Sequence, residues 1–253
     1  MNQTHPNQLL HLQLAALRDT LLRASRTELS ESAVTAVCDY LEHKQDLSTP
    51  ADPELESLIL EVRRLSVRVA CSLEKQLAGR LALEPDACLE YFQKTSEFAR
   101  LEGHSAELDS HSKVLFVGGG SLPVSALTLA RTFGCQVTSL DHDLEACRLA
   151  NHTLAQAGMP SNLEIRWGKI ARIRPDEYTH IWIASLVSGK EQILSCLSHK
   201  APHSTVVVRY ANDLRAIFNF CLDIPACFPW LAFRHLEVAG HLHDTAVMRS
   251  ALH

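Results

Sequence analysis

The sequence predicts an α/β fold in which a doubly wound, mostly parallel sheet follows an all-helical N-terminal part. Up to about residue 110, apolar residues recur at helical spacing, and no glycine occurs before Gly79. From His111 onward, short apolar runs alternate with helical stretches, as they do where crossover helices join parallel strands. We therefore expect a helical cover domain at residues 1–110 and a sheet domain at residues 111–253.

The helical part contains several well-marked stretches. Leucines recur every three or four residues over 10–21, and a second apolar stripe lies at 34–41. Proline suits the first position of a helix, and the pattern that follows predicts a long helix from Pro53 to about Ala82. A further helix is expected over Pro85–Glu102, with Gly103 as its stop.

The second part contains apolar runs of strand length. The expected strands are 113–117, 136–140, 163–167, 180–185, 205–210, 233–238 and 245–251. The expected helices between them are 123–133, 144–157 and 190–198. Only a short turn, 239–244, joins the last two runs, which predicts an antiparallel hairpin at the sheet edge. This arrangement is typical of the class I S-adenosylmethionine-dependent methyltransferase-like (Rossmann-like) fold.

Composition and charge exclude several classes of protein. The net charge of −5 and the lack of a basic run interleaved with aromatics argue against a nucleic-acid partner. No run of about 18 apolar residues is present, so no membrane span is expected. The polar stretch 1–8 lacks the apolar core of a signal peptide, which favours a cytoplasmic protein. The eight cysteines form no Cys-x-x-Cys pair, so we interpret them as small buried hydrophobes.

A glycine turn follows the first expected strand, with Gly118, Gly119 and Gly120 before Ser121. A dinucleotide fingerprint would continue with a glycine where this chain has proline. A looser glycine turn, with an acid at the end of the second strand, suits S-adenosylmethionine, which has no phosphate to cradle. Asp141 is that acid and is expected to accept hydrogen bonds from the ribose hydroxyls. The alternative is that the turn and the acid are general features of doubly wound sheets.

Ligands of this fold lie over the carboxyl ends of the strands, which adds residues to the expected site. The further cofactor contacts expected beyond strands three and four are Lys169, Ile170, Ser185 and Leu186. Arg209 and Tyr210 end the fifth strand. Arg209 is either a solvated strand end or a clamp for an amino-acid carboxylate, since its planar fork matches that group.

The segment LFVGGGSLPVSALTLA resembles the FVGSGPLP-type signature of nicotianamine synthases. It resembles still more their shorter bacterial relatives, which make opine metallophores of the staphylopine, pseudopaline and yersinopine kind. Matching segments lie at 90–92, 98–102, 182–187 and 207–209, so the resemblance runs from about residue 60 to the end. The chain departs from the family with Gly-Gly-Gly-Ser where Gly-Ser-Gly-Pro is commoner, and with a shorter segment before Tyr91 than plant members have.

The resemblance implies that S-adenosylmethionine donates its aminobutyrate group. An amine attacks the γ-carbon of the methionine moiety, and 5′-methylthioadenosine leaves. In the bacterial relatives the acceptor is histidine, for which we expect the L form and one transfer. The resemblance further implies a homodimer and a separate NAD(P)H-dependent opine dehydrogenase that acts on the product. We expect no metal in the reaction.

The resemblance also implies catalytic residues upstream of the glycine turn. The family's helical glutamate and the tyrosine of its next helix correspond to Glu74 and Tyr91, and Glu102 corresponds to a substrate-binding acid. Glu74 is unusual in itself because it shares a helical stripe with small apolar residues, where a carboxylate should have a raised pKa that suits a general base. The alternative is a helix-rim glutamate paired with Arg63 or Lys75.

Two other functions agree with parts of the pattern. An ordinary small-molecule methyltransferase could use the same fold and donor. A non-catalytic metal-binding protein is suggested by the fourteen histidines, above all by His241, His243 and Asp244 in the expected hairpin turn. Such residues in a turn are more often exposed polar groups, so we expect no metal there.

Overall fold

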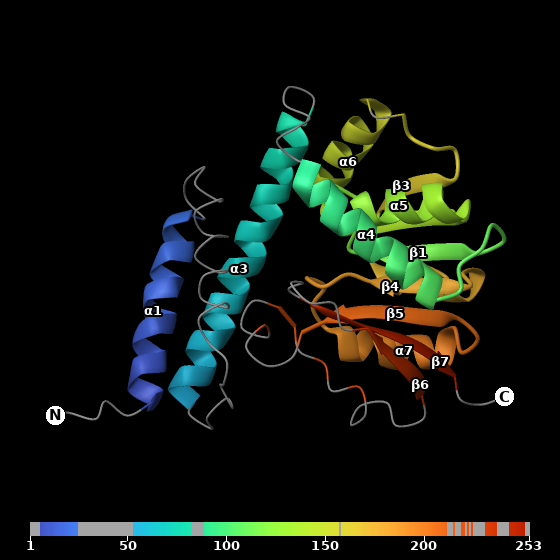
Figure 1. Cartoon of the computed structure of the whole chain (residues 1–253). Helices are drawn as coiled ribbons and strands as arrows, with labels where there is room; N and C mark the ends of the chain where they lie inside the picture. The colour runs from blue at the N-terminus through green and yellow to red at the C-terminus, as the bar shows by residue number, and fades with distance from the viewer. Residues whose placement is uncertain are drawn as a thin grey trace. The chain divides into compact units, whose positions relative to one another are not determined.

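The computed structural model describes residues 6–24, 53–81, 89–156, 158–211, 215, 219–220, 222, 224, 231–236 and 243–250. The chain divides into two compact units, one of Met1–Leu73 with Ala211–Cys221 and one of Glu74–Tyr210 with Leu222–His253. This boundary differs from the expected one at residue 110. The physical reason is that helix α4 (Leu89–Ser105) packs on a helix and a strand of the sheet unit (Figure 1).

In the first unit, helix α1 (Pro6–Ala24) and most of helix α3 (Pro53–Arg80) share one apolar cluster. The leucines of α1 expected to face a core are all buried, at positions 10, 14, 17 and 21. They pack with buried residues of α3 such as Val62 and Leu65. The two helices predicted from periodicity are thus confirmed, while the stripe at 34–41 lies outside the described residues.

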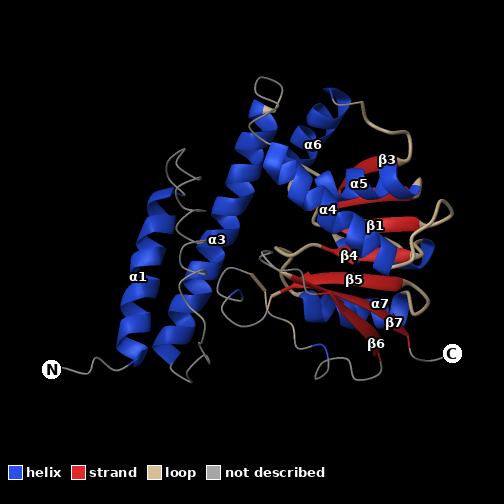
Figure 2. Cartoon of the chain, viewed as in Figure 1, coloured by secondary structure: helices blue, strands red, loops and turns tan. Residues whose placement is uncertain are grey.

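The sheet unit contains the predicted doubly wound sheet, with the strand order β3-β2-β1-β4-β5-β7-β6 (Figure 2). Its strands are β1 (Lys113–Val117), β2 (Gln136–Asp141), β3 (Leu163–Trp167), β4 (His180–Ile183), β5 (Thr205–Tyr210), β6 (Leu231–Leu236) and β7 (Asp244–Ser250). The first five are parallel, and β7 runs antiparallel to both β5 and β6. The expected antiparallel pair at the sheet edge is confirmed.

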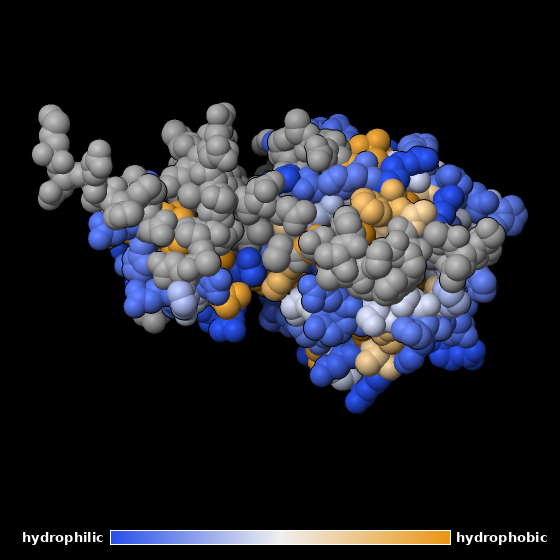
Figure 3. Space-filling view, turned by 90° about the horizontal axis from the view of Figure 1, so that it is seen from below, coloured by the Kyte–Doolittle hydropathy of each residue, from blue (hydrophilic) through white to orange (hydrophobic). Residues whose placement is uncertain are grey.

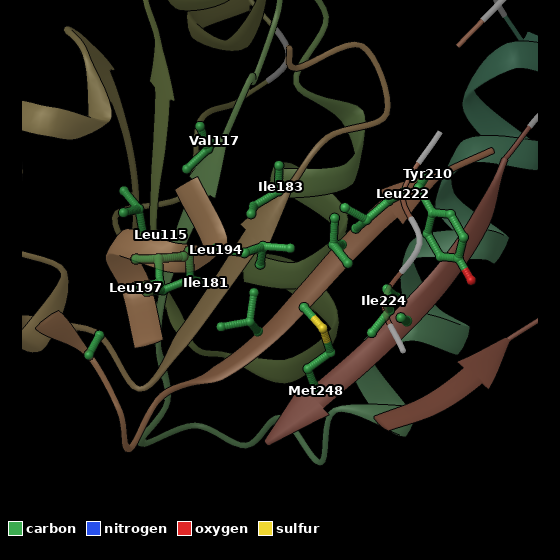
Figure 4. Packing of buried hydrophobic residues seen from close by; sticks show 14 of the residues in the cluster. Leu115, Val117, Ile181, Ile183, Leu194, Leu197, Tyr210, Leu222, Ile224 and Met248 are labelled. Atoms are coloured by element: carbon green, nitrogen blue, oxygen red, sulfur yellow. The ribbon is translucent and has the colours of Figure 1, made fainter. Parts of the chain in front are cut away.

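Alternating side chains give the sheet two apolar faces. Odd and even positions of β1 separate cleanly: Val114 and Phe116 join a cluster with α4, α5 (Val124–Phe133) and α6 (Leu144–Gln156). Leu115 and Val117 join the other cluster, with Leu194 of α7 (Lys190–Lys200) (Figure 4). The strands buried on both faces explain why their sequences read as continuous apolar runs.

Gly103 does not stop α4, which runs on to Ser105. A Cβ at this position would collide with the ring of Phe133 in α5. The glycine is therefore needed for the close approach of two helices, and the expectation that it ends the helix is wrong.

The cysteines divide into two groups. Cys135 and Cys147 are buried, as expected, and burial raises the pKa of each thiol to about 11. Cys71 and Cys196 are exposed, which corrects the interpretation of all the cysteines as core residues.

The described residues on the face seen in Figure 3 are mostly hydrophilic, with hydrophobic ones in small separate groups. Among the described helices, none combines the length and apolar character that a membrane span requires.

Candidate active site

The glycine turn is fixed by backbone hydrogen bonds to the end of β2. The amides of Gly118 and Gly119 donate to the carbonyl of Leu140, at 2.8 and 3.2 Å. The amide of Gly120 donates to Oδ2 of Asp141 at 2.8 Å. All three N–H groups are thus bonded within the protein, unlike the free amides with which a phosphate-binding turn holds its ligand.

Two of these glycines are required by conformation and by close approach. Gly118 and Gly120 have φ values of +84° and +67°, which side-chain-bearing residues rarely adopt. A Cβ at Gly118 would lie 2.5 Å from Cγ2 of Val187, in the loop after β4. A Cβ at Gly120 would collide with Oε2 of Glu74. The carboxylate of Glu74 therefore lies directly against the glycine turn.

Asp141 is oriented by the loop that follows β2. Its side chain is only 12% exposed. Oδ2 accepts the Gly120 amide, and Oδ1 accepts the amide of Asp143 at 2.9 Å. The ring of His142 lies 3.5 Å from Oδ1. The predicted site residues Gly120, Asp141 and Glu74 are therefore gathered at one point, where the end of α3 meets the ends of β1 and β2.

An ion-pair cluster beside Glu74 was not expected from the sequence. Nζ of Lys75 lies 2.8 Å from Oδ2 of Asp143 and 2.5 Å from Oε2 of Glu145. The hydrogen bond from Lys75 is the main reason that the pKa of Asp143 lies below its ordinary value. Partial burial lowers the pKa of Lys75, but its bonds to the two carboxylates outweigh this and leave the pKa raised.

The loop between β4 and α7 is held by a buried lysine. Lys190 is only 3% exposed, and its ammonium donates to the carbonyls of Ser185 at 2.6 Å and Val187 at 2.8 Å. Ser185 and Leu186, predicted cofactor contacts, thus lie in a loop with fixed backbone that packs through Val187 on Gly118. A lysine at the start of a helix carried no sequence signal of this role, because surface lysines are common there.

The segment after β3 also reaches the end of β2. The amide of Gly168 donates to the carbonyl of Asp141 at 2.8 Å, and Lys169 then precedes a short 3₁₀ helix that begins at Ile170. The indole of Trp167, 60% exposed, donates to the carbonyl of His142 at 3.0 Å. Lys169 and Ile170 follow directly after this contact, and Ile170 packs on the apolar cluster of the α7 face, so their role as cofactor contacts stays a prediction.

Glu102 and Arg209, both predicted to bind substrate, are instead paired with each other. Nη2 of Arg209 lies 2.6 Å from Oε2 of Glu102, and its Nε lies 2.9 Å from Oε1. Glu102 is 0% exposed and also accepts from the indole of Trp182 and the hydroxyl of Thr245. Arg209 donates further to Ser125. The two charges therefore satisfy each other inside the core, and a substrate-binding role for either residue stays a prediction.

The structure gives less information on how the remaining predicted residues, Tyr210, Ser121 and Tyr91, relate to the glycine turn. Tyr210 is 3% exposed, and its hydroxyl hydrogen-bonds to the stacked ring of His235, so its side chain belongs to the core on the α7 face. Ser121 is buried within the glycine turn. Tyr91 lies in the first turn of α4, and its side chain is outside the described residues.

The hairpin-turn metal site gains no support. His241 lies outside the described residues, and the ring of His243 packs edge-on against Phe98 at 4.8 Å between centroids. Within the part of the chain that the structure describes, no three His, Cys, Asp or Glu side chains are grouped to hold a metal ion.

Comparison with known proteins identifies the family. The family model described as "Nicotianamine synthase protein" matches residues 10–242. The chain belongs to the nicotianamine synthase family. This confirms the resemblance found in the glycine turn and carries it across both units of the chain.

Curated relatives within this family carry a specific name. An L-histidine 2-aminobutanoyltransferase of Pseudomonas aeruginosa (strain UCBPP-PA14) is 31% identical over 202 residues, which are 79% of this chain and 76% of that protein. A protein of the same name from Yersinia pestis is 28% identical over 205 residues, 80% of this chain and 76% of that protein.

Solved structures share the nicotianamine synthase fold. A variant of MtNAS in complex with S-adenosylmethionine superposes with a TM-score of 0.73 at 15% identity, covering 92% of this chain and 97% of that one. MtNAS in complex with MTA and tNA gives a TM-score of 0.75 at 16% identity, covering 93% and 95%. The predicted S-adenosylmethionine-dependent, Rossmann-like fold class is thereby confirmed.

Proposed function

We propose that this nicotianamine synthase family member transfers the 2-aminobutyrate group of S-adenosylmethionine to the α-amine of histidine and releases 5′-methylthioadenosine. The observation that carries the proposal is the match to L-histidine 2-aminobutanoyltransferase at 31% identity over 79% of the chain. The enzyme is then a transferase of the EC 2.5.1 type that uses S-adenosylmethionine as a substrate rather than as a methyl donor.

The chemistry is a displacement at carbon. The lone pair of the neutral α-amine forms a bond to the γ-carbon as the γ-carbon–sulfur bond breaks, and the electron pair of that bond passes to sulfur. The sulfonium becomes the neutral thioether of 5′-methylthioadenosine. Because histidine's amine is an ammonium near neutral pH, a base must take one proton before the attack. The site must also hold the amine in line with the bond that breaks.

Asp141 and the glycine turn are the proposed nucleoside site. The turn has its amides bonded within the protein, which suits a donor without phosphate better than a dinucleotide. Asp141 is held in place by two backbone amides and is proposed to accept from the ribose hydroxyls. The other proposed cofactor contacts are Gly118, Gly120, Ser121, Lys169, Ile170, Ser185 and Leu186.

Glu74 is the proposed general base. Its carboxylate lies against Gly120, the same residue whose amide binds Asp141, so a base and a ribose acceptor flank one turn. This closeness supports a role at the reacting amine. Tyr91, in the first turn of α4, is proposed as its partner in orienting the amine.

The product indicates the reaction that consumes it. It keeps the primary amine and the carboxylate of the transferred group together with the carboxylate of histidine, whose α-amine has become a secondary amine. A primary amine can condense with the carbonyl of a 2-oxo acid, and hydride from NAD(P)H can reduce the resulting imine. We therefore propose a separate opine dehydrogenase downstream. From the family resemblance we also propose L-histidine as the acceptor and a homodimer, and we propose a cytoplasmic location.

The test is to identify the nucleoside that the protein releases. Incubation with S-adenosylmethionine and L-histidine, followed by chromatography, should give 5′-methylthioadenosine in an amount equal to the histidine consumed. D-histidine in place of L-histidine should give a slower reaction. Release of S-adenosylhomocysteine would instead identify a methyltransferase and overturn the proposal.

A further inference from the structure

A closed ring of contacts links the proposed base to the proposed ribose acid. Glu74 and Lys75 are neighbours in α3, and Lys75 binds Asp143 and Glu145. The amide of Asp143 donates to Oδ1 of Asp141. Oδ2 of Asp141 accepts the amide of Gly120, against which the carboxylate of Glu74 lies.

Both carboxylate oxygens of Asp143 take part in this ring of contacts. Oδ1 accepts the amides of Glu145 at 2.9 Å and Ala146 at 3.3 Å, so it caps the N-terminus of α6. Oδ2 is left to face Lys75. One carboxylate therefore fixes the loop after β2 and also presents a charge to α3.

We propose that Lys75 is a positioning residue that sets the rotation of the end of α3, and so holds the carboxylate of Glu74 at Gly120 beside Asp141. This inference rests on the proposed function. Adjacent helix residues point about 100° apart, so Lys75 does not neutralise Glu74 directly but fixes its direction through the backbone. Apolar packing of Ala78 on Leu122 and Val124 holds the same helix end, and the ion pairs of Lys75 add a second, polar attachment to the loop after β2.

The alternative role for Lys75 is an ordinary surface ion pair. Its side chain is 27% exposed, and pairs at such sites add little to stability. A suitable control is Arg174, which is likewise paired with two carboxylates, Asp176 and Glu177, but within its own exposed turn. A purely electrostatic surface role predicts that losing either cation has the same effect.

The experiment compares Lys75→Met, Lys75→Arg, Asp143→Asn, the Lys75→Met/Asp143→Asn double variant and Arg174→Met. Asparagine keeps the cap of α6 and removes the charge. We expect Lys75→Met to lower kcat roughly tenfold, with the Kd for S-adenosylmethionine changed by less than about threefold, because misplacing a catalytic group costs rate more than binding. Lys75→Arg should restore most of the rate, and the double variant should be no slower than Lys75→Met.

Hydrogen exchange separates this proposal from the proposed function. The amides of residues 74–80 should exchange faster in Lys75→Met than in the wild type and be unchanged in Arg174→Met, whatever reaction is catalysed. Equal behaviour of Lys75→Met and Arg174→Met in rate and exchange would overturn the positioning role, as would rate losses that multiply in the double variant. A wild-type protein that forms no 5′-methylthioadenosine would overturn the function, and the exchange data alone would then decide the role of Lys75.

Discussion

Glu102 of α4 and Arg209 of β5 form an ion pair inside the sheet unit, 107 residues apart in sequence and 2.6 Å apart in space. The pair connects α4, which carries Tyr91, to the strand that ends at Tyr210. Arg209 also lies over the rings of Phe98 and Phe116, 5.6 Å from each centroid. A buried charge pair with this many partners ties a helix to a sheet in one register.

Breaking this pair should destabilise the protein. Arg209→Met leaves the Glu102 carboxylate buried without its cation, which costs about 3–5 kcal/mol of unfolding free energy. The double variant Arg209→Met/Glu102→Leu should recover part of that loss, because no unpaired charge remains. Urea unfolding measures both. Normal stability of Arg209→Met with a raised histidine KM would return Arg209 to the substrate site.

Asp141→Ala tests the nucleoside site. Loss of a charged acceptor for the ribose hydroxyls should weaken binding of S-adenosylmethionine by roughly 2–4 kcal/mol before relaxation. The Gly120 amide loses its partner as well, so the turn should also loosen. Titration calorimetry gives the affinity, and Asp176→Ala, in an exposed turn, is the control. Unchanged affinity would leave Asp141 as a structural residue of the turn.

The Lys75–Asp143 pair should make stability depend on pH at both extremes. The pKa of Asp143 is lowered in the folded state, so its contribution is present above the ordinary aspartate pKa and is lost as the pH falls below about 4. The pKa of Lys75 is raised, so its contribution is present below the ordinary lysine pKa and is lost as the pH rises beyond about 10.5. The stability difference between wild type and Asp143→Asn should therefore be flat near neutrality and shrink at both ends. A difference independent of pH would contradict the pairing.

Glu74→Gln separates a base from a positioning group. Glutamine keeps the size of the side chain and removes its basicity, so the variant should fold and bind S-adenosylmethionine. Turnover should fall by roughly 10²-fold or more, the usual contribution of a positioned base. The acidic limb of the kcat–pH profile should disappear with it. A change confined to the histidine KM would mean that Glu74 only orients the ammonium group, and near-normal kinetics would remove it from the site.

Local patterns in the sequence predicted most of the fold. The strands are buried on both faces and therefore read as apolar runs, and the leucines of α1 recur because one face is covered. The boundary between units was misplaced because a helical pattern does not reveal what its apolar face packs against, and α4 packs on the sheet unit.

The sequence predicted the part of the site that depends on strand ends, but not the part that depends on contacts between distant segments. Gly120 and Asp141 follow directly from where strands end, since parallel strands bring their carboxyl ends together. Lys75 pairs with Glu145, 70 positions away, and Glu102 pairs with Arg209, 107 positions away. No local sequence pattern indicates which distant residue such a charge will pair with. The sequence therefore predicted that Glu102 and Arg209 contact a ligand, and it did not reveal that they form an ion pair with each other.

The most direct test of the central claim follows the carbon atoms of the donor. S-adenosylmethionine labelled with carbon-13 in the aminobutyrate chain, or in the methyl group, is incubated with L-histidine, and the products are analysed by mass spectrometry. The account predicts that the chain label appears on histidine and the methyl label leaves with the nucleoside as 5′-methylthioadenosine. Methyl label on histidine, with the chain label retained in S-adenosylhomocysteine, would contradict it.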